Sequence, residues 1–230
     1  MVHFLPQPRP EVDPLVQKSG TMVVVAPAAI TERGRRTRRR IVDAALEVVA
    51  ERGAQATSLD EVGARAGTSK SQLYHYFDDR DDLLRAVAEA TNDIVLDAQT
   101  ELFAGLGTAA GMRAWADALV QLNESRHGAG GCPIASLVAQ VGERDEGARA
   151  VLAGGFDRWE AAIRSGLQAQ RDAGELRDDA DLDWLATCVL ASLQGGLVLA
   201  QARRGSAALR AALDGALAVV DSHRTRPWGQ

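Results

Sequence analysis

Apolar residues recur three and four positions apart along almost the whole chain from residue 31 onward, and this spacing restricts the chain to helices. The clearest apolar stripe ends near Gly53 and consists of Ile41, Ala44, Ala45, Val48 and Val49. No stretch shows the sustained apolar and polar alternation of a half-buried strand. The sequence therefore predicts an all-α protein of about nine helices.

Two short segments after this stripe carry helix-start signals. Ser58 is followed three residues later by Glu61, and Ser69 by Gln72, which is the spacing of a capping box. These signals predict helices over 59–66 and 70–77, separated by a tight turn at Gly67. Two short helices joined in this way are typical of a helix-turn-helix.

The second of these short helices has one apolar and one polar side. Leu73 and Phe77 lie four positions apart and are expected to point inward, with help from Tyr76. The outward side carries hydrogen-bond donors and rings that can stack: Lys70, Ser71, Tyr74 and His75. A helix of this size fits the major groove of DNA, so this side is expected to face DNA. The alternative is that Tyr74 and His75 only complete a small core.

A dense basic cluster precedes the helix-turn-helix. The segment RGRRTRRR places six arginines within eight positions, from Arg33 to Arg40. Such a cluster is a candidate contact for the phosphate backbone of DNA, and Arg36 and Arg39 are its predicted contact residues. The alternative is a solvated helix start or a disordered tail. The chain as a whole is acidic, with a net charge of −5, so a protein that coats DNA along its full surface is excluded.

Residues 41–84, IVDAALEVVAERGAQATSLDEVGARAGTSKSQLYHYFDDRDDLL, resemble the DNA-binding part of TetR/AcrR transcriptional regulators. The matching positions are Gly53, Thr57, Ala66-Gly67, Ser69, Leu73-Tyr74, Phe77, Arg80 and Leu83. Three positions depart from the family pattern: Thr68 replaces an aliphatic residue, Ser71 a glycine and Arg80 a lysine. Thr68 and Ser71 are expected to alter which bases are read.

The resemblance implies a set of DNA contacts: Thr57, Ser58, Ser69, Lys70, Gln72, Tyr74, His75 and Arg80. Tyr74, His75 and Arg80 are expected to touch mainly phosphates. Specificity is expected to come from residues closer to base edges, which are Ser69, Lys70, Ser71 and Gln72. The assignment of Gln72 competes with its role as the capping partner of Ser69.

Residues 1–30 are rich in proline and show little periodicity, so they are predicted to be a flexible tail. The resemblance implies that a helix-turn-helix domain, 31–79, and a helical effector-binding and dimerisation domain, 80–230, follow. Within the last of these the breaks predict helices at 80–104, 109–126, 133–143, 146–173, 181–203 and 206–222. In the family, ligand binding tilts the helix that starts near residue 80 and thereby moves the recognition helix.

Large apolar residues of the second domain are the candidate walls of an effector pocket. They are Phe103, Trp115, Leu119, Leu122, Leu137, Phe156, Trp159, Ile163 and Trp184. Because few charges lie among them, the expected effector is small and largely apolar or aromatic. The alternative for each residue is that it belongs to the ordinary core.

The segments 181–203 and 206–222 are the predicted homodimer interface. Gly195 and Gly196 lie inside the first of them, and glycine within a helix costs about 1 kcal/mol relative to alanine. A pair of glycines there favours close contact with another helix, which in this family belongs to the second subunit. The alternative is a neighbour within the same chain. A dimer would present two recognition helices to a palindromic operator.

Cys132 lies in GGCPIASL, before a proline at an expected helix start. This segment and LQGG at 193–196 resemble the LmrA/YxaF-like multidrug-response branch of the family. The main expectation is a ligand-responsive repressor. The alternatives are a transcriptional activator, or a redox or electrophile sensor that uses Cys132.

Other classes of function find little support in the sequence. The four histidines are scattered, and the two cysteines lack the neighbours of a zinc site, so we expect no enzyme, no metal and no cofactor. The apolar run near the N-terminus contains Pro27 and is much shorter than the roughly 20 residues that span a bilayer. These features predict a cytoplasmic protein without a membrane partner.

Overall fold

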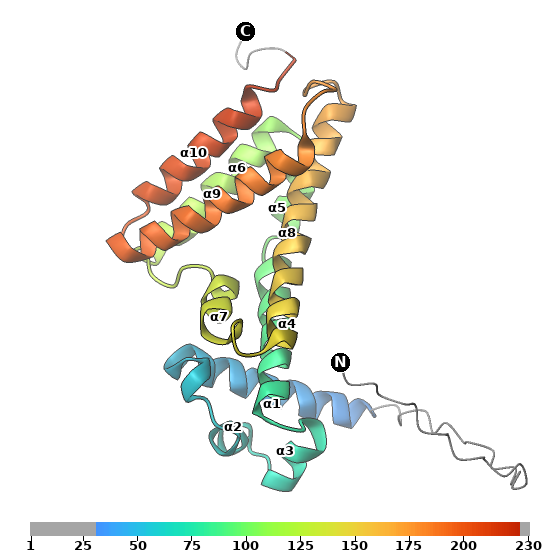
Figure 1. Cartoon of the computed structure of the whole chain (residues 1–230), viewed down its shortest axis with the longest axis vertical. Helices are drawn as coiled ribbons and strands as arrows, with labels where there is room; N and C mark the ends of the chain where they lie inside the picture. Colours follow the sequence, from blue (N-terminus) through green and yellow to red (C-terminus); the bar gives the residue numbers. More distant parts are fainter. Residues whose placement is uncertain (1–30, 226–230) are drawn as a thin grey trace, which may run out of the picture.

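A computed structural model describes residues 31–225, so the predicted tail 1–30 lies outside the described residues. The described part holds ten α-helices and one 3-10 helix (Figure 1). The helices are α1 (Glu32–Arg52), α2 (Leu59–Ala66), α3 (Lys70–Tyr76), α4 (Arg80–Asp97), α5 (Thr100–Gly105), α6 (Ala109–Ser125), α7 (Pro133–Val141), α8 (Glu146–Asp172), α9 (Leu182–Arg203) and α10 (Ala207–Asp221), with η1 (Ala54–Ala56) after α1. The all-α prediction is confirmed.

The predicted helix over 80–104 is wrong, because the chain breaks there into α4 and α5. Gln99 leaves the helical conformation and its side chain is buried. Its amide donates to Val95 O at 2.9 Å and accepts a hydrogen bond from Trp115 Nε1 at 3.0 Å. Trp115 lies on α6, so a tertiary contact fixes this break. This explains why no glycine or proline marks the break in the sequence. It also explains why residues 31–225 hold ten α-helices where nine were expected.

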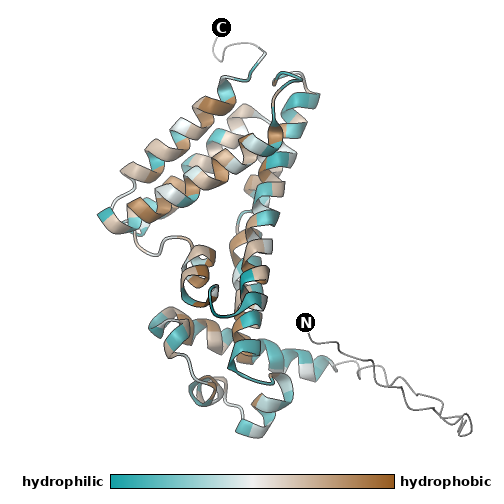
Figure 2. Ribbon diagram, viewed as in Figure 1, coloured by the Kyte–Doolittle hydropathy of each residue, from teal (hydrophilic) through white to brown (hydrophobic). Residues whose placement is uncertain are grey.

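The helices are arranged as a small lower unit and a larger upper unit (Figure 1). Helices α1, α2 and α3 form the small unit, and α4 rises from it beside the long helix α8. Helices α6, α9 and α10 lie side by side at the upper end, and α7 sits between them and the small unit. Figure 2 shows the strongly hydrophilic N-terminal part of α1 and the largely hydrophobic α9 and α10.

Helix α9 is long and apolar enough to cross a membrane by length and composition, with a mean hydropathy of 1.5. In the structure it packs along α10 and α8, and its buried side includes Leu185, Val189 and Leu193. Packing inside the folded domain therefore accounts for one side of α9, whereas Trp184, Val198 and Leu199 on its outer side stay exposed.

A glycine on α8 allows this helix to pack closely against the C-terminal end of α5. A Cβ atom added at Gly166 would lie 2.4 Å from Leu106 Cβ and 2.8 Å from Leu106 O. Gln170, one turn later, donates to Leu106 O at 2.8 Å. At Gly154, on the same helix, an added Cβ would meet no atom within 4 Å.

This contrast predicts opposite effects of one substitution at two positions of one helix. Gly166→Ala should lower the free energy of unfolding by about 1–3 kcal/mol, because Leu106 would have to move. Gly154→Ala should raise it by up to about 1 kcal/mol through helix propensity. Urea denaturation followed by circular dichroism measures both, and equal effects would contradict the packing described for Leu106.

Candidate nucleic-acid interface and ligand cavity

Local hydrogen bonds set the turn between α2 and α3. Ser69 accepts a hydrogen bond from Gln72 N at 3.2 Å, and the Gln72 side chain accepts one from Ser69 N at 3.2 Å, so this capping box is complete. Ser58 accepts from Glu61 N at 3.2 Å, but the Glu61 carboxylate pairs with Arg52 Nε at 3.1 Å. Gly67 ends α2 in the left-handed conformation, with φ of 62°, as the turn requires.

The close approach of α2 and α3 depends on a small residue. A Cβ atom added at Gly63 would lie 3.4 Å from Leu73 Cδ1 and 3.5 Å from Thr68 O. Leu73 and Phe77 are each 1% exposed, and Tyr76 is half-buried. The predicted inward side of α3 is therefore confirmed, and its opposite side is left at the surface.

The exposed side of α3 carries the predicted base-reading and phosphate-contacting residues. They are Ser69, Lys70, Ser71, Gln72, Tyr74 and His75, and all of them are exposed. Tyr74 is 47% exposed, and the His75 ring meets the Tyr76 ring edge-on with a centroid separation of 5.0 Å. The alternative that Tyr74 and His75 complete a core is therefore wrong.

Two of these residues already have partners within the domain. Lys70 Nζ lies 3.2 Å from Asp60 Oδ1 on α2, and a hydrogen bond to this carboxylate raises the pKa of Lys70. The ammonium group therefore keeps its charge, and a phosphate or a base edge would have to replace Asp60. Gln72 is held by its capping role, and its amide nitrogen is the group available for a further contact.

Thr57 and Arg80, which the resemblance places at DNA, make hydrogen bonds within the protein that hold η1 and α2 in place. Thr57 is 3% exposed, and its hydroxyl donates to Gly53 O at 3.0 Å. Arg80 Nε donates to Thr57 O at 2.8 Å, and Arg80 Nη2 donates to the carbonyl oxygens of Ala54 and Gln55. Their side chains are occupied in this structure, and their predicted DNA contacts remain predictions.

Basic side chains follow α1 toward its N-terminus. Arg36 and Arg39 are exposed and, in the described part of the chain, form no ion pair. They line a groove of about 440 Å³ between α1 and α4, together with four carboxylates: Glu32, Asp43, Glu89 and Asp93. Two neighbouring arginines have structural contacts, because Arg38 stacks 5.1 Å from the centre of the Phe77 ring and Arg40 donates to Ala66 O.

A second site is an apolar cavity of about 250 Å³ in the upper unit. Helices α4, α5, α6, α8 and α9, the loop before α7 and the first residue of α7 form its walls. Three predicted pocket residues, Leu119, Leu122 and Trp159, line it. Ile94 and Leu197 also line the cavity and were not predicted to, because their helical spacing does not differ from that of ordinary core residues.

Six predicted pocket residues do not line this cavity: Phe103, Trp115, Leu137, Phe156, Ile163 and Trp184. Trp115 and Ile163 are fully buried in the core, and Trp184 is 54% exposed on α9. Helical periodicity marks the inward side of a helix, but it does not tell a filled core from a cavity.

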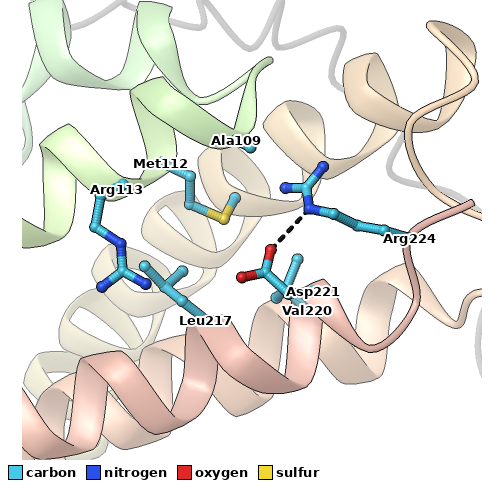
Figure 3. Close-up of a pocket in the computed structure, with 7 residues that line it drawn as sticks. All are labelled: Ala109, Met112, Arg113, Leu217, Val220, Asp221 and Arg224. Atoms are coloured by element: carbon cyan, nitrogen blue, oxygen red, sulfur yellow. Dashed lines mark hydrogen bonds and ion pairs between the residues drawn. The ribbon is translucent and has the colours of Figure 1, made fainter. Parts of the chain in front are cut away.

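A further pocket, between α6 and α10, is too small to hold an effector (Figure 3). Its volume is about 10 Å³, which is space for roughly one water molecule. Figure 3 shows Arg224 beside it, paired with Asp221 at 2.7 Å. Arg224 also reaches Glu175 at 3.2 Å, so this cluster fastens the end of α10 to the turn after α8.

The outer sides of α9 and α10 form an exposed surface of apolar and small residues. Its large members are Trp184, Val198 and Leu199, all on α9, which are 54%, 59% and 44% exposed. Its small members are Ala191, Gly195, Ala202, Ala207, Ala211, Gly215 and Ala218. We call this surface the α9/α10 face.

The two glycines of α9 have different surroundings. A Cβ atom added at Gly196 would lie 2.9 Å from Leu209 Cα on α10, so this glycine admits a neighbour within the chain. At Gly195 an added Cβ would meet no atom within 4 Å, and the same holds for Gly215. The alternative of an intrachain neighbour is therefore correct for Gly196 and does not account for Gly195.

Comparisons with known proteins agree with this architecture. The family model described as bacterial regulatory proteins of the tetR family matches residues 41–87, and that of the tetracyclin repressor-like C-terminal domain matches residues 108–216. An uncharacterised HTH-type transcriptional regulator of Mycobacterium tuberculosis is 31% identical over 173 residues, which cover 73% of this chain and 85% of that protein. The transcriptional regulator AcuR of Cereibacter sphaeroides is 28% identical over 70% of this chain and 74% of its own length.

Solved structures share the fold at low sequence identity. A TetR-family regulator from Cytophaga hutchinsonii superposes with a TM-score of 0.71 at 16% identity, over 86% of this chain and 99% of that one. The TetR-family protein from Mesorhizobium loti has a TM-score of 0.69 at 22% identity, over 84% and 99%. The chain therefore belongs to the TetR family, whose members are DNA-binding transcriptional regulators and not enzymes.

Proposed function

We propose that this protein is a cytoplasmic, dimeric transcriptional repressor that a small, largely apolar effector releases from a palindromic operator. The observation that carries the proposal is the two-sided character of α3, which buries Leu73 and Phe77 and exposes a row of donors. Buried anchors fix the orientation of the helix, so the exposed side chains can meet a DNA groove in a defined register.

The contacts divide into two kinds. Ser69, Lys70 and Ser71, at the start of α3, would read base edges, with the Gln72 amide as a further donor. Ser58, Tyr74 and His75 would contact phosphates on either side, and Arg36 and Arg39 would reach the backbone from α1. Arg80 and Thr57 would act mainly by holding η1 and α2 in place.

The DNA contacts predict different behaviour for two variants. In an anisotropy assay with the upstream intergenic DNA of its own gene, the protein should prefer this DNA over scrambled DNA at about 150 mM salt. Tyr74→Ala should weaken operator binding at least about tenfold, because a hydrogen bond to a charged phosphate is lost. Arg144→Ala, a surface variant far from α3 in the chain, serves as the control. Equal operator binding by Tyr74→Ala and the unchanged protein would refute the assignment.

The α9/α10 face is the proposed dimer interface. It exposes three large apolar side chains, Trp184, Val198 and Leu199, next to small residues that allow helices to approach closely. Gly195 and Gly215 are open in the single chain, and a facing helix from a second subunit would account for both. An apolar patch of this kind is typical of a protein–protein interface.

A charge placed on this face should separate the subunits. Leu199→Asp would bury a carboxylate in the interface and should raise the dimer dissociation constant by about 100-fold or more. Tyr74→Asp places the same charge on an exposed residue of α3 and should leave the dimer intact. Sedimentation velocity across a concentration series measures both variants. An unchanged dimer for Leu199→Asp would place the interface elsewhere.

Helix α7 is the proposed connection between effector and DNA. Its N-terminal residues Cys132 and Pro133 line the cavity, and Gln140, near its other end, accepts a hydrogen bond from Ala54 N at 2.6 Å. Ala54 is fully buried at the start of η1, and its carbonyl oxygen accepts from Arg80 on α4. A displacement of α7 by a ligand would therefore act on the junction of α1, η1 and α4, which positions the helix-turn-helix.

Removal of the hydrogen bond between Gln140 and Ala54 should weaken the release of operator by the effector, while the effector site and the DNA-binding site remain intact. Gln140→Ala should reduce the effect of any operator-releasing compound several-fold, while the affinities for free operator and for that compound change by less than about threefold. Ser136→Ala removes the other hydrogen-bond partner of Gln140, at 3.1 Å, and should leave the response intact. A full response in Gln140→Ala would rule out this route.

The remaining alternatives have weaker support. Cys132 is 6% exposed, and burial raises the pKa of its thiol, which is the environment of an unreactive cysteine. Ligand response is therefore favoured over thiol sensing. Repression is favoured over activation because release of DNA by a ligand needs no contact with polymerase. Membership of the LmrA/YxaF-like branch remains a prediction from two short segments.

A further inference from the structure

The polar groups in the walls of the apolar cavity are mainly hydrogen-bond donors. Among the residues that line it are one cation, Arg126, and no aspartate or glutamate. Asn123 and Trp159 also line it and present an amide and an indole N–H. The side-chain donors near the cavity therefore outnumber its acceptors, and the only formal charge is positive.

Two of these polar groups are buried and unsatisfied. Asn123 is 5% exposed and its Oδ1 has no hydrogen-bond partner in the described part of the chain. Trp159 is 3% exposed and its Nε1 likewise lacks one. An unpaired buried polar group destabilises the folded protein, so a ligand that paired with both groups would recover this cost. The oxygen and nitrogen of an asparagine amide can exchange places, so Asn123 can also act as a donor.

Arg126 and the adjoining helix ends add positive potential. Arg126 is exposed at the end of α6, and no ion pair with it occurs within residues 31–225. The positive N-terminal end of α7 opens on the cavity at Cys132 and Pro133. The negative end of α6 is partly neutralised, because Asn123 O and Glu124 O accept hydrogen bonds from the backbone N–H groups of residues 126–128.

We infer that this cavity binds an organic acid with an apolar body and a carboxylate. The body would fill the space beside Leu119 and Leu197, and the carboxylate would accept hydrogen bonds from Arg126, Trp159 Nε1 and the Asn123 amide. A cationic ligand would meet Arg126 without a compensating carboxylate. This inference rests on the proposal that the cavity is the effector site, and it narrows the class of effector.

Matched pairs of compounds test the inference by direct binding without DNA. Isothermal titration calorimetry at pH 7.5 would compare naphthalene-2-carboxylate, biphenyl-4-carboxylate and decanoate with the corresponding carboxamides. At least one carboxylate should bind about tenfold or more tightly than its amide, because its hydrogen bonds are charge-assisted. If no pair shows this preference, including the case in which no compound binds, the inference is overturned.

Variants of two exposed arginines locate the carboxylate. Arg126→Gln should weaken binding of the preferred carboxylate about tenfold and change binding of its amide less than about twofold. Arg144→Gln removes the same charge from the loop before α8, away from the cavity lining, and should change neither affinity. Equal carboxylate affinities for Arg126→Gln and the unchanged protein would overturn the assignment.

Release of operator DNA separates this inference from the proposed function. A carboxylate that binds through Arg126 but leaves operator affinity unchanged would support the acid site and count against its role as the effector site. Operator release by neutral compounds alone, without any preference for acids, would support the repressor and overturn the acid site.

Discussion

The N–H and the carbonyl oxygen of Ala54, the buried residue of η1, connect the small unit to the upper unit. The Ala54 N–H is paired with Gln140 on α7, and the Ala54 carbonyl oxygen is paired with Arg80 on α4. Because a buried peptide group is costly when unpaired, both hydrogen bonds help to hold the small unit in position, together with the packing of α1 against α4. The same two hydrogen bonds therefore support the fold and offer a route from the effector domain to the recognition helix.

The glycines of the upper unit have two distinct structural roles. Gly166 and Gly196 are required inside the chain, where a side chain would strike Leu106 or Leu209. Gly195 and Gly215 face open space, Gly195 lies within about one turn of the exposed Val198 and Leu199, and a single chain gives no reason for these glycines. The first pair stabilises the domain by close packing, and the second is best explained by a facing subunit.

The apolar cavity combines a hydrophobic wall with polar groups that the protein itself does not satisfy. Trp115, in the neighbouring core, donates its indole N–H to Gln99, whereas Trp159, at the cavity, has no such partner. Folding stability alone would favour a buried indole N–H that has a hydrogen-bond partner, as in Trp115. The unpaired Trp159 N–H and Asn123 amide beside the cavity are therefore more readily explained by a ligand than by the core, and the Arg126 guanidinium indicates the charge of that ligand.

The sequence by itself determined the helix-turn-helix and most helix boundaries, because the Ser58 cap, the Ser69 capping box, the Gly67 turn and the apolar spacing act between residues close together in the chain. For the same reason the inward side of α3, with Leu73 and Phe77, could be predicted. Only the tertiary structure decided the break at Gln99, the structural roles of Thr57 and Arg80, and which large apolar residues meet the cavity. Each of these depends on partners 16 or more residues away, such as Trp115 for Gln99 and Thr57 for Arg80, or on a space that several helices leave unfilled, which local spacing does not encode.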